Sequence, residues 1–421
     1  MRDMWGGPGT RGGCGEESFQ VMVEAEEGLV EAGGARSVLH VITALGRGGA
    51  ENHLVDLVRH QRAEGRRVAV AHLRADAYWR AALEQCGAEV HGLGLQYYGE
   101  PGPCLRLARL LRRGGFDLVH AHLPPAELYA RAAMLGVDGV RLPLVISKHN
   151  DEPFCRMPGE RWMARWTAGR ARRVIAISHA VARYMEGPSA GIERGKLRVV
   201  HYGIDPARMV EREPGGAAAL RRLWGVGEDA LVIGFVGRLV PQKDLGTLLR
   251  AFALFARGHP EARLVMVGVG PLEEELRRLA GCLGIEGATV WAGFREDVGE
   301  VMRALDVLAL TSLYEGFGLV LLEAMAAWRP VVASAVSAVP EVVEDGVTGL
   351  LAPVGRPEAF ASAFERMVDA PLRHRMGEEA ARRVSREFSL SKMGALTDAV
   401  YAEALREEEE AEEIGALVGL G

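Results

Sequence analysis

Short apolar runs rich in β-branched residues alternate with amphipathic segments along most of the chain. Before residue 206 these runs cover residues 38–42, 68–73, 89–93, 118–120, 144–147, 174–177 and 198–201. Buried parallel strands give short apolar runs, and the helices that connect them give longer segments with one apolar face. The pattern therefore predicts a parallel sheet with crossover helices.

A break between Pro206 and Gly227, which contains Pro214-Gly215-Gly216, indicates a linker followed by a short helix. The alternation then resumes, with predicted strands at residues 231–236, 263–267, 289–291, 307–310, 331–333 and 349–351. At 421 residues the chain is long for a single core. We therefore predict an α/β protein with two Rossmann-like parallel-sheet domains, residues 37–205 and residues 206–385.

The two ends of the chain differ from this pattern. Residues 1–36 are rich in Gly and Glu without periodicity, so we expect a disordered extension or a misplaced start. Residues 386–405 keep a helical pattern. Residues 406–421 contain the acidic run Glu407–Glu413 and are predicted to be a solvated acidic tail.

Composition narrows the class of protein. Hydrophobic residues make up 48% of the chain, which supports two good cores, and the net charge of -6 gives no global sign of nucleic-acid binding. The five cysteines form no C-x-x-C pair, which argues against a metal site or a disulfide framework. No apolar run approaches the roughly 20 residues of a membrane-spanning helix, and no signal-peptide pattern is present. We expect a soluble cytoplasmic protein or one attached peripherally to a membrane.

Two carboxylates, Glu315 and Glu323, bracket a glycine turn that follows the predicted strand 307–310. The turn, Glu315-Gly-Phe-Gly-Leu, runs into good helix formers. Free N–H groups of a first helical turn suit a phosphate or a sugar oxygen, and carboxylates accept hydrogen bonds from hydroxyls. The segment therefore indicates a nucleotide-sugar site, and the alternative is an ordinary helix with a solvated Glu323.

Two cations, Arg238 and Lys243, follow the predicted strand 231–236. Ligands of open α/β sheets bind at the carboxyl ends of the strands, where Arg and Lys can neutralise a diphosphate. The alternative is a loop with two solvated cations. Gly268-Val269-Gly270-Pro271-Leu272-Glu273 lacks the third glycine of the dinucleotide fingerprint, so we assign it a structural role and disfavour an NAD-dependent oxidoreductase.

The first domain offers a glycine loop and a histidine pair. Gly48 and Gly49 lie between the first predicted strand and a helix, where they let the backbone approach a ligand. His120 and His122 end a strand and point to the same side of the sheet. A metal pair and hydrogen bonding to a sugar are both considered, and we expect no metal because no third ligand has suitable spacing.

Arginines alternate with Trp162 and Trp166 between Arg161 and Arg173, and Arg106–Arg113 is a second basic segment. Helices that lie on anionic membranes show such a pattern. The alternative is a helix whose two tryptophans, four residues apart, pack on the domain. Peripheral contact with an anionic membrane and simple packing both stay open.

Together the motifs resemble family-4 glycosyltransferases of the two-Rossmann-domain architecture called GT-B, from Ser37 to Leu405. The most specific matches are Gly237-Arg238 with Lys243-Asp244-Leu245, and Glu315-Gly-Phe-Gly with Glu323. Weaker matches are Gly48-Gly49-Ala50-Glu51, His-Ala-His at 120–122, and residues 388–401. The resemblance implies two domains that face each other across a cleft, with the helix at 386–405 crossing back to the first domain.

The resemblance also implies the activity. Such enzymes are retaining, metal-independent glycosyltransferases that move a sugar from a nucleoside-diphosphate sugar to a glycan or lipid-linked acceptor. The products belong to cell-envelope or exopolysaccharide synthesis, and the enzymes work in the cytoplasm or at the inner face of the membrane. No cofactor beyond the donor is implied, and the lack of an Asp-x-Asp motif at a strand end agrees with the lack of a metal.

Site roles follow from the same resemblance, residue by residue. Arg238 and Lys243 would bind the diphosphate, and Glu323 would bind the ribose hydroxyls. Glu315, with the backbone of Phe317, Gly318 and Leu319, would bind the transferred sugar.

Gly48, Gly49 and His122 would approach the donor from the first domain. One departure concerns residues 336–339, Val-Ser-Ala-Val, where many relatives carry a glycine pair before Pro-Glu-Val-Val. Rival functions are a nucleotide-sugar epimerase or hydrolase and a nucleotide-sugar-binding protein without turnover. The base, the sugar, the acceptor and the oligomeric state are not specified by the sequence.

Overall fold

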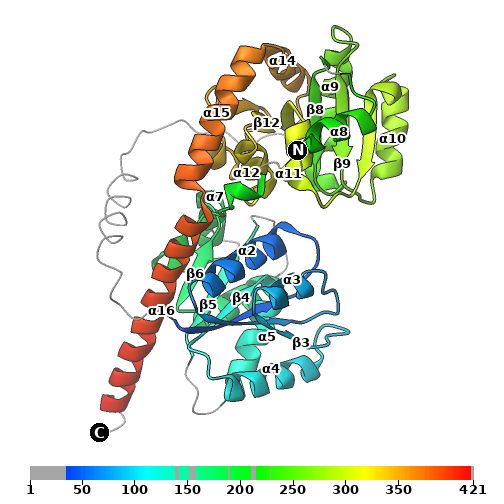
Figure 1. The fold of residues 1–421 in the computed structure, drawn as a ribbon. Helices are drawn as coiled ribbons and strands as arrows, with labels where there is room; N and C mark the ends of the chain where they lie inside the picture. Colours follow the sequence, from blue (N-terminus) through cyan, green and yellow to red (C-terminus); the bar gives the residue numbers. More distant parts are fainter. Residues whose placement is uncertain are drawn as a thin grey trace. The chain divides into compact units, whose positions relative to one another are not determined.

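The computed structural model contains two parallel sheets, each covered by helices (Figure 1). It describes residues 35–137, 142–150, 158–187, 190–209, 215–227 and 229–418, without the side chains of 158–161 and 412–418. The predicted extension at residues 1–36 therefore lies almost entirely outside the described residues, and so does Arg161 as a side chain.

The first sheet has seven strands in the order β3-β2-β1-β4-β5-β6-β7, and every neighbouring pair is parallel. Its strands are β1 Ser37–Ile42, β2 Arg67–His72, β3 Glu89–Gly92, β4 Leu118–His122, β5 Leu144–Lys148, β6 Arg173–Ala176 and β7 Leu197–Val199. All seven predicted strands are confirmed, with ends that differ by at most two residues.

The second sheet has six strands in the order β10-β9-β8-β11-β12-β13, again all parallel. Its strands are β8 Val232–Val236, β9 Arg263–Val267, β10 Thr289–Gly293, β11 Val307–Leu310, β12 Val331–Ser334 and β13 Gly349–Ala352. The predicted fold of two Rossmann-like α/β domains is thus confirmed. In each sheet the strand order reverses once, between β1 and β4 and between β8 and β11, and a parallel sheet opens its loops for a ligand at such a point.

Helices connect successive strands on both faces of each sheet. In the first domain they are α2 Gly49–Ala63, α3 Arg80–Gln85, α4 Pro101–Gly114, α5 Pro124–Leu135, α6 Pro158–Arg170 and α7 His179–Glu186. Later helices are α8 Gly216–Leu223, α9 Leu245–Ala256, α10 Glu273–Cys282, α11 Val298–Ala304, α12 Leu319–Ala326, α13 Val339–Val342, α14 Pro357–Arg366 and α15 Ala370–Glu387. Short 3₁₀ turns are η2 Arg194–Lys196, η3 Pro206–Met209, η4 Pro241–Lys243 and η5 Glu286–Ala288.

The last helix, α16 Leu390–Val418, returns to the first sheet and contacts α2, β5 and β6 (Figure 1). Met393, Val400 and Tyr401 are buried against one residue from each of β4, β5 and β6, of which Leu118 and Val145 are two. In the described part of the chain, the apolar cluster around these strand residues takes its helical members from α2 and α16. The last helix therefore supplies much of one face of the first domain's core.

The structure corrects the predicted acidic tail. The sequence places the end of the last helix near Leu405, whereas α16 continues to Val418. Glu407 and Glu408 lie in this helix and form ion pairs with the basic segment at the start of β6. The first glutamates of the acidic run therefore pack against the first domain, because arginines of that domain neutralise their charge.

The same ion pairs change the interpretation of the basic-aromatic segment. Arg170 and Arg172 donate to Glu408 at 3.3 and 2.8 Å, and Arg173 donates to Glu403 at 2.6 Å. Trp162 is exposed, and its ring lies 6.1 Å from that of Trp166, so the two tryptophans do not both face the core. Among the helices that the structure describes, none is long and apolar enough to cross a bilayer.

We expect Gly203→Ala to destabilise the protein, because Gly203 is the point at which the chain after β7 touches the start of α16. A β-carbon at residue 203 would lie 2.3 Å from the carbonyl oxygen of Ser389 and 2.9 Å from Cβ of Met393. The backbone or Met393 would have to shift to make room for this carbon. Such overpacking lowers the free energy of unfolding by about 1–3 kcal/mol, which urea denaturation can measure. Gly227→Ala is the control, since nothing lies within 4 Å of its added carbon, and an equal effect of both changes would contradict this packing argument.

Candidate functional site

The second-domain half of the site lies where β8 and β11 end. Arg238 follows β8 and is exposed, and Lys243 closes η4 five residues later. The Lys243 ammonium forms an ion pair with the Glu315 carboxylate, and their side chains are only 14% and 7% exposed. Ser312 also donates to Oε1 of Glu315 at 2.6 Å. The structure thus brings Lys243 and Glu315 into direct contact.

The glycines of the Glu315 motif have different physical roles. Gly318 is the N-cap of α12 and has φ 87°, a left-handed conformation that favours glycine. Gly316 lies against the first domain, because a β-carbon there would be 2.3 Å from the carbonyl oxygen of His149. The Gly316 carbonyl also accepts a hydrogen bond of 3.0 Å from Ser178, the N-cap of α7. The motif therefore joins the two domains.

The first-domain half of the site is the glycine loop at the start of α2. A β-carbon on Gly49 would lie 3.9 Å from Leu319, and one on Gly48 would lie 2.3 Å from Oε2 of Glu51. Burial raises the pKa of Glu51, and the charge of Arg238 partly offsets this effect. The structure thus brings Gly49 beside the start of α12, and Glu51 close to Arg238. Sequence reasoning quoted Glu51 only as part of the glycine loop and gave it no role.

The loop after β9 supports the Arg238 loop. A β-carbon on Gly268 would lie 1.9 Å from the carbonyl oxygen of Gly237, and one on Gly270 would lie 2.3 Å from that of Leu239. Such distances exclude any side chain at either position unless the backbone shifts. The structural role expected for this glycine pair is therefore confirmed, and it keeps the loop of Arg238 in place.

Glu323 lies on α12 beside a second charged group that joins the domains. Arg208, in η3, donates to both carboxylate oxygens of Asp56 on α2, at 2.6 and 2.8 Å. Burial raises the pKa of Glu323 to about 7, an effect that Arg208 reduces and Asp56 increases. Removal of the carboxyl group from water therefore favours its neutral form although Arg208 is nearby.

The atypical loop at residues 336–339 packs directly on the Glu315 motif. The backbone N–H of Ala338 donates to the carbonyl oxygen of Glu315 at 3.3 Å. Ser337 has φ 48°, so a residue other than glycine holds a left-handed conformation here. The loop therefore keeps a contact with the site although the glycine pair of many relatives is replaced.

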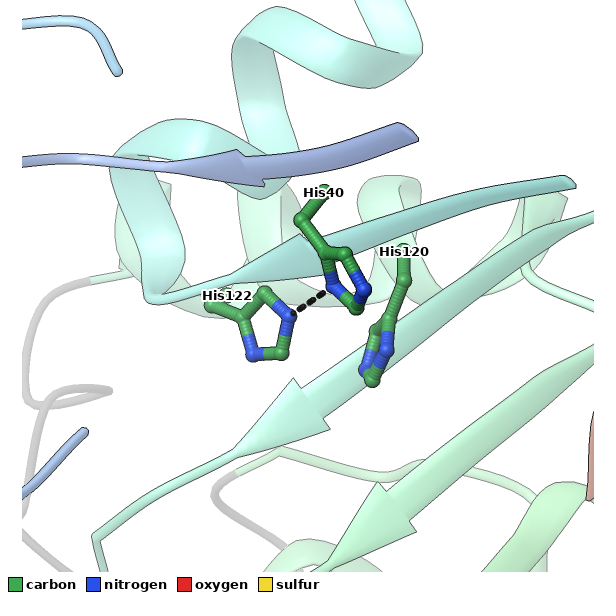
Figure 2. A group of neighbouring side chains, drawn as sticks. All are labelled: His40, His120 and His122. Carbon is green, nitrogen blue, oxygen red and sulfur yellow. Dashed lines mark hydrogen bonds between the residues drawn. The ribbon is translucent and has the colours of Figure 1, made fainter. Parts of the chain in front are cut away.

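Figure 2 shows His122 in a cluster with His40 of β1 and His120 of β4. His122 is fully buried, and both of its ring nitrogens are occupied: Nε2 lies 3.0 Å from Nδ1 of His40, and Nδ1 lies 3.2 Å from Nε2 of His149. His120 and His122 point to the same side of the sheet, as predicted, with ring centroids 4.0 Å apart. Sequence reasoning missed His40, although the register places it opposite His120.

Hydrogen bonds extend from this cluster in two directions. His40 Nε2 lies 2.8 Å from Oε1 of Gln61 on α2, whose amide nitrogen donates to the Tyr401 hydroxyl at 3.3 Å. His149 Nδ1 lies 2.5 Å from the hydroxyl of Tyr202, whose ring centroid is 5.4 Å from that of Phe317. A chain of hydrogen bonds therefore runs from Tyr401 of α16 to Tyr202, and the Tyr202 ring contacts Phe317 in the glycine turn of the second domain.

One set of tautomers satisfies the whole chain. Burial lowers the pKa of His40 to about 4 and that of His149 to about 3, and it lowers the pKa of His122 well below the usual value. With all rings neutral, the Nε2–H groups of His40, His122 and His149 donate, and each Nδ1 accepts. Sequence reasoning expected His122 to bond a sugar or phosphate, and in this state its ring bonds two other histidines.

Two family models match the chain: Glycosyltransferase Family 4 over residues 47–208 and Glycosyl transferases group 1 over residues 218–383. The D-inositol 3-phosphate glycosyltransferase of Streptomyces avermitilis is 33% identical over 376 residues, which cover 80% of this chain and 75% of that protein. The alpha-D-kanosaminyltransferase of Streptomyces kanamyceticus is 28% identical over 317 residues, which cover 71% of this chain and 80% of that protein.

Among solved structures, the fold is similar to that of Anabaena HepE in complex with UDP and glucose. The TM-score is 0.76 at 26% identity, and the match covers 90% of this chain and 100% of HepE. HepE in complex with UDP-glucose gives a TM-score of 0.75 at 26% identity, and that match covers 88% of this chain and 99% of HepE.

The buried histidines should make the protein sensitive to acid. Burial lowers the pKa of five histidines in and around this cluster, His40, His53, His120, His122 and His149. The unfolded chain takes up protons below pH 6.5 while these folded groups stay neutral, so stability falls as the pH falls. We expect the unfolding free energy to drop by about 5 kcal/mol between pH 7.5 and 5.5, measured by urea denaturation.

His40→Gln should make the drop between pH 7.5 and 5.5 smaller by about 1 kcal/mol, since it removes one of the five groups. His374→Gln on α15 is the control, because the His374 side chain is 77% exposed. A urea midpoint that does not change between the two pH values would refute the neutral state of the cluster.

Glu323→Gln should stabilise the protein at high pH. The pKa of Glu323 rises from 4.5 to about 7 on folding, so between these values the unfolded chain is ionised at this residue while the folded protein still holds the proton. The free energy of unfolding is therefore highest below pH 4.5 and falls as the pH rises through 7. Glutamine carries no charge, and we expect it to gain about 2–3 kcal/mol at pH 8 and nothing at pH 4.5. Glu274→Gln on the exposed face of α10 is the control, and a gain that does not depend on pH would contradict the raised pKa.

Proposed function

Because the chain belongs to the family-4, group 1 glycosyltransferases, which have the GT-B fold, we propose that it moves a sugar from a nucleoside-diphosphate sugar to an acceptor hydroxyl with retention of configuration. The family assignment rests on the two family models and on a relative that is 33% identical over 80% of the chain. The donor and the stereochemistry are the proposal. The observation that carries it is the set of Arg238, Lys243 and Glu315 at the point where the order of the second sheet reverses.

The chemistry requires positive charge at the leaving group. The bond between the anomeric carbon and the phosphate oxygen breaks, and the acceptor oxygen bonds to that carbon. The acceptor proton passes to an oxygen of the departing diphosphate. Arg238, Lys243 and the N-terminal N–H groups of α12 would stabilise the charge that develops on the phosphate, so the proposal needs no metal ion.

The pairing of Lys243 with Glu315 suggests how donor binding reorganises the site. A diphosphate competes with Glu315 for the ammonium group, because phosphate oxygens form strong charge-assisted hydrogen bonds. Glu315 released from Lys243 can then accept hydrogen bonds from the hydroxyls of the transferred sugar. Glu323, with its pKa of about 7, would bind the ribose hydroxyls.

The first domain would complete the donor site. Gly49 beside Leu319 leaves backbone free to approach the donor. His122 can reach the donor only if its bond to His40 or to His149 opens, so its role in orienting the sugar depends on closure of the two domains around the substrate.

The choice of donor and acceptor follows the relatives. Anabaena HepE was solved with UDP-glucose, so we propose a UDP-hexose as the first donor to test. The name of the Streptomyces avermitilis relative specifies an inositol 3-phosphate acceptor, so a phosphorylated polyol belongs in the acceptor panel beside glycans and lipid-linked sugars.

Cytoplasmic localisation and peripheral membrane contact stay predictions. Trp162 and Met163 are exposed on α6, which supports such a contact. Arg170, Arg172 and Arg173 are already paired with α16, so they contribute little net charge to it. Binding to anionic vesicles that Trp162→Ala abolishes would support the prediction, and a lack of binding by the intact protein would remove it.

We expect transfer from UDP-glucose to at least one acceptor of this panel, and Lys243→Ala should lower kcat/KM by about 100-fold or more. Loss of one charged contact to the leaving phosphate removes roughly 3 kcal/mol of transition-state stabilisation. Product should be followed by mass spectrometry, and its anomeric configuration by NMR. Arg278→Ala is the control, because Arg278 is an exposed cation on α10 of the same domain.

The rival functions give other results in the same assay. An epimerase or hydrolase alters the donor when no acceptor is present, and a binding protein binds UDP-sugars without turnover. Equal activity of the Lys243→Ala and wild-type proteins would refute the assigned donor site.

A further inference from the structure

Three side chains with metal-binding atoms meet where α7, the end of β7 and α13 come together. His179 begins α7, His201 follows β7, and Glu341 lies in α13 of the second domain. One ligand atom from each residue lies within 4.8 Å of the other two. The transfer reaction proposed above uses none of these residues.

The Glu341 carboxylate is already fixed by the first domain. Its Oε2 accepts from the backbone N–H of His179 at 2.8 Å, and its Oε1 accepts from that of Ala180 at 2.7 Å. Glu341 therefore satisfies the first N–H groups of α7 from the other domain. Arg183 approaches Oε1 at 3.9 Å but is 70% exposed, so the interaction is weak.

The distances suit a tetrahedral metal ion. His201 Nε2 lies 3.2 Å from Oε2 of Glu341. Two ligands of a tetrahedral Zn²⁺ ion, each at about 2.0–2.1 Å, lie about 3.3 Å apart. His179 is exposed on the first turn of its helix, so its ring can rotate to close the remaining gap. A water molecule would supply the fourth ligand.

Binding of a metal ion through Nε2 of His201 would displace the proton that this nitrogen donates to Glu341.

The cluster of His40, His120 and His122 lacks these properties. Its three rings are buried, it has no carboxylate, and its nitrogens are hydrogen-bonded within the cluster or to Gln61, Tyr401, Ser147 and His149. A divalent ion there would be a buried charge without a compensating anion, which is costly. The site with Glu341 supplies that anion and lies closer to solvent.

We infer that His179, His201 and Glu341 form a Zn²⁺ site that links the first domain to α13 of the second domain. A divalent ion held from both domains would restrict their relative movement at this junction. α13 follows directly on the loop of Ala338, which contacts Glu315. Bound zinc should therefore slow turnover by hindering domain closure, and this second consequence rests on the proposed function.

Calorimetric titration of the full chain without a polyhistidine tag, with ZnCl₂ at pH 7.5, tests the site. We expect one ion per chain, and His179→Ala should weaken binding at least about tenfold. The His179 side chain is exposed, so this change should leave the fold intact. His374→Ala is the matched control, since His374 is an exposed histidine beside Glu378 on α15.

Co²⁺ gives a second readout, because tetrahedral Co²⁺ absorbs visible light strongly and His179→Ala should abolish this absorption. Equal zinc affinity of the His179→Ala and wild-type proteins would refute the proposed site, because it would mean that the ion binds elsewhere. Zinc that binds at this site but leaves kcat unchanged would overturn the effect on closure alone. The binding test does not depend on the donor, so failure of the proposed transfer leaves it intact.

Discussion

The parallel direction of every strand is the constraint from which the site follows. Parallel neighbours need crossover helices, so the carboxyl ends of all strands of one sheet lie at one edge. In both sheets the strand order reverses once, and the loops after β1 and β8 diverge from their neighbours there. The loop after β1 carries Gly48 and Gly49, and the loop after β8 carries Arg238. Because the loops diverge at these points, their glycines and cations are accessible to a ligand.

A second constraint is that the two domains meet through close contacts between their backbones. Gly316 can touch the carbonyl of His149 only because it has no side chain. Glu341 can cap α7 only because α13 lies against that helix. The polar chain from Tyr401 to Tyr202 lies between these contacts and α16. Its directional hydrogen bonds fix the ring orientations of three histidines without any charge, which suits a buried position.

Much of the fold and part of the site could be predicted from the sequence. All thirteen strands were predicted, because apolar runs of β-branched residues report burial directly. Arg238, Lys243 and Glu315 were predicted as a group because residues at the ends of parallel strands converge. Their pairing could not be foreseen, since the contact of Lys243 with Glu315 spans 72 residues.

The remaining features depend on contacts that no local pattern reports. Gln61 and Tyr401 are 340 residues apart, and no sequence pattern indicates that their side chains meet. The length of α16 was underestimated because a run of glutamates is typical of a solvated segment. Arginines from the first domain override that preference, and they are distant in the sequence. The capping of α7 by Glu341 was missed for the same reason.

The return of α16 to the first sheet has a consequence for synthesis of the chain. Leu118, Val145 and Ile175 are buried by α16, which is synthesised after them. As the nascent polypeptide leaves the ribosome, these strands emerge more than 200 residues before the segment that covers them. The amino-terminal domain therefore cannot complete its core before α16 has been synthesised, although domains generally fold in order of synthesis. Until then one apolar face of its sheet stays open to solvent.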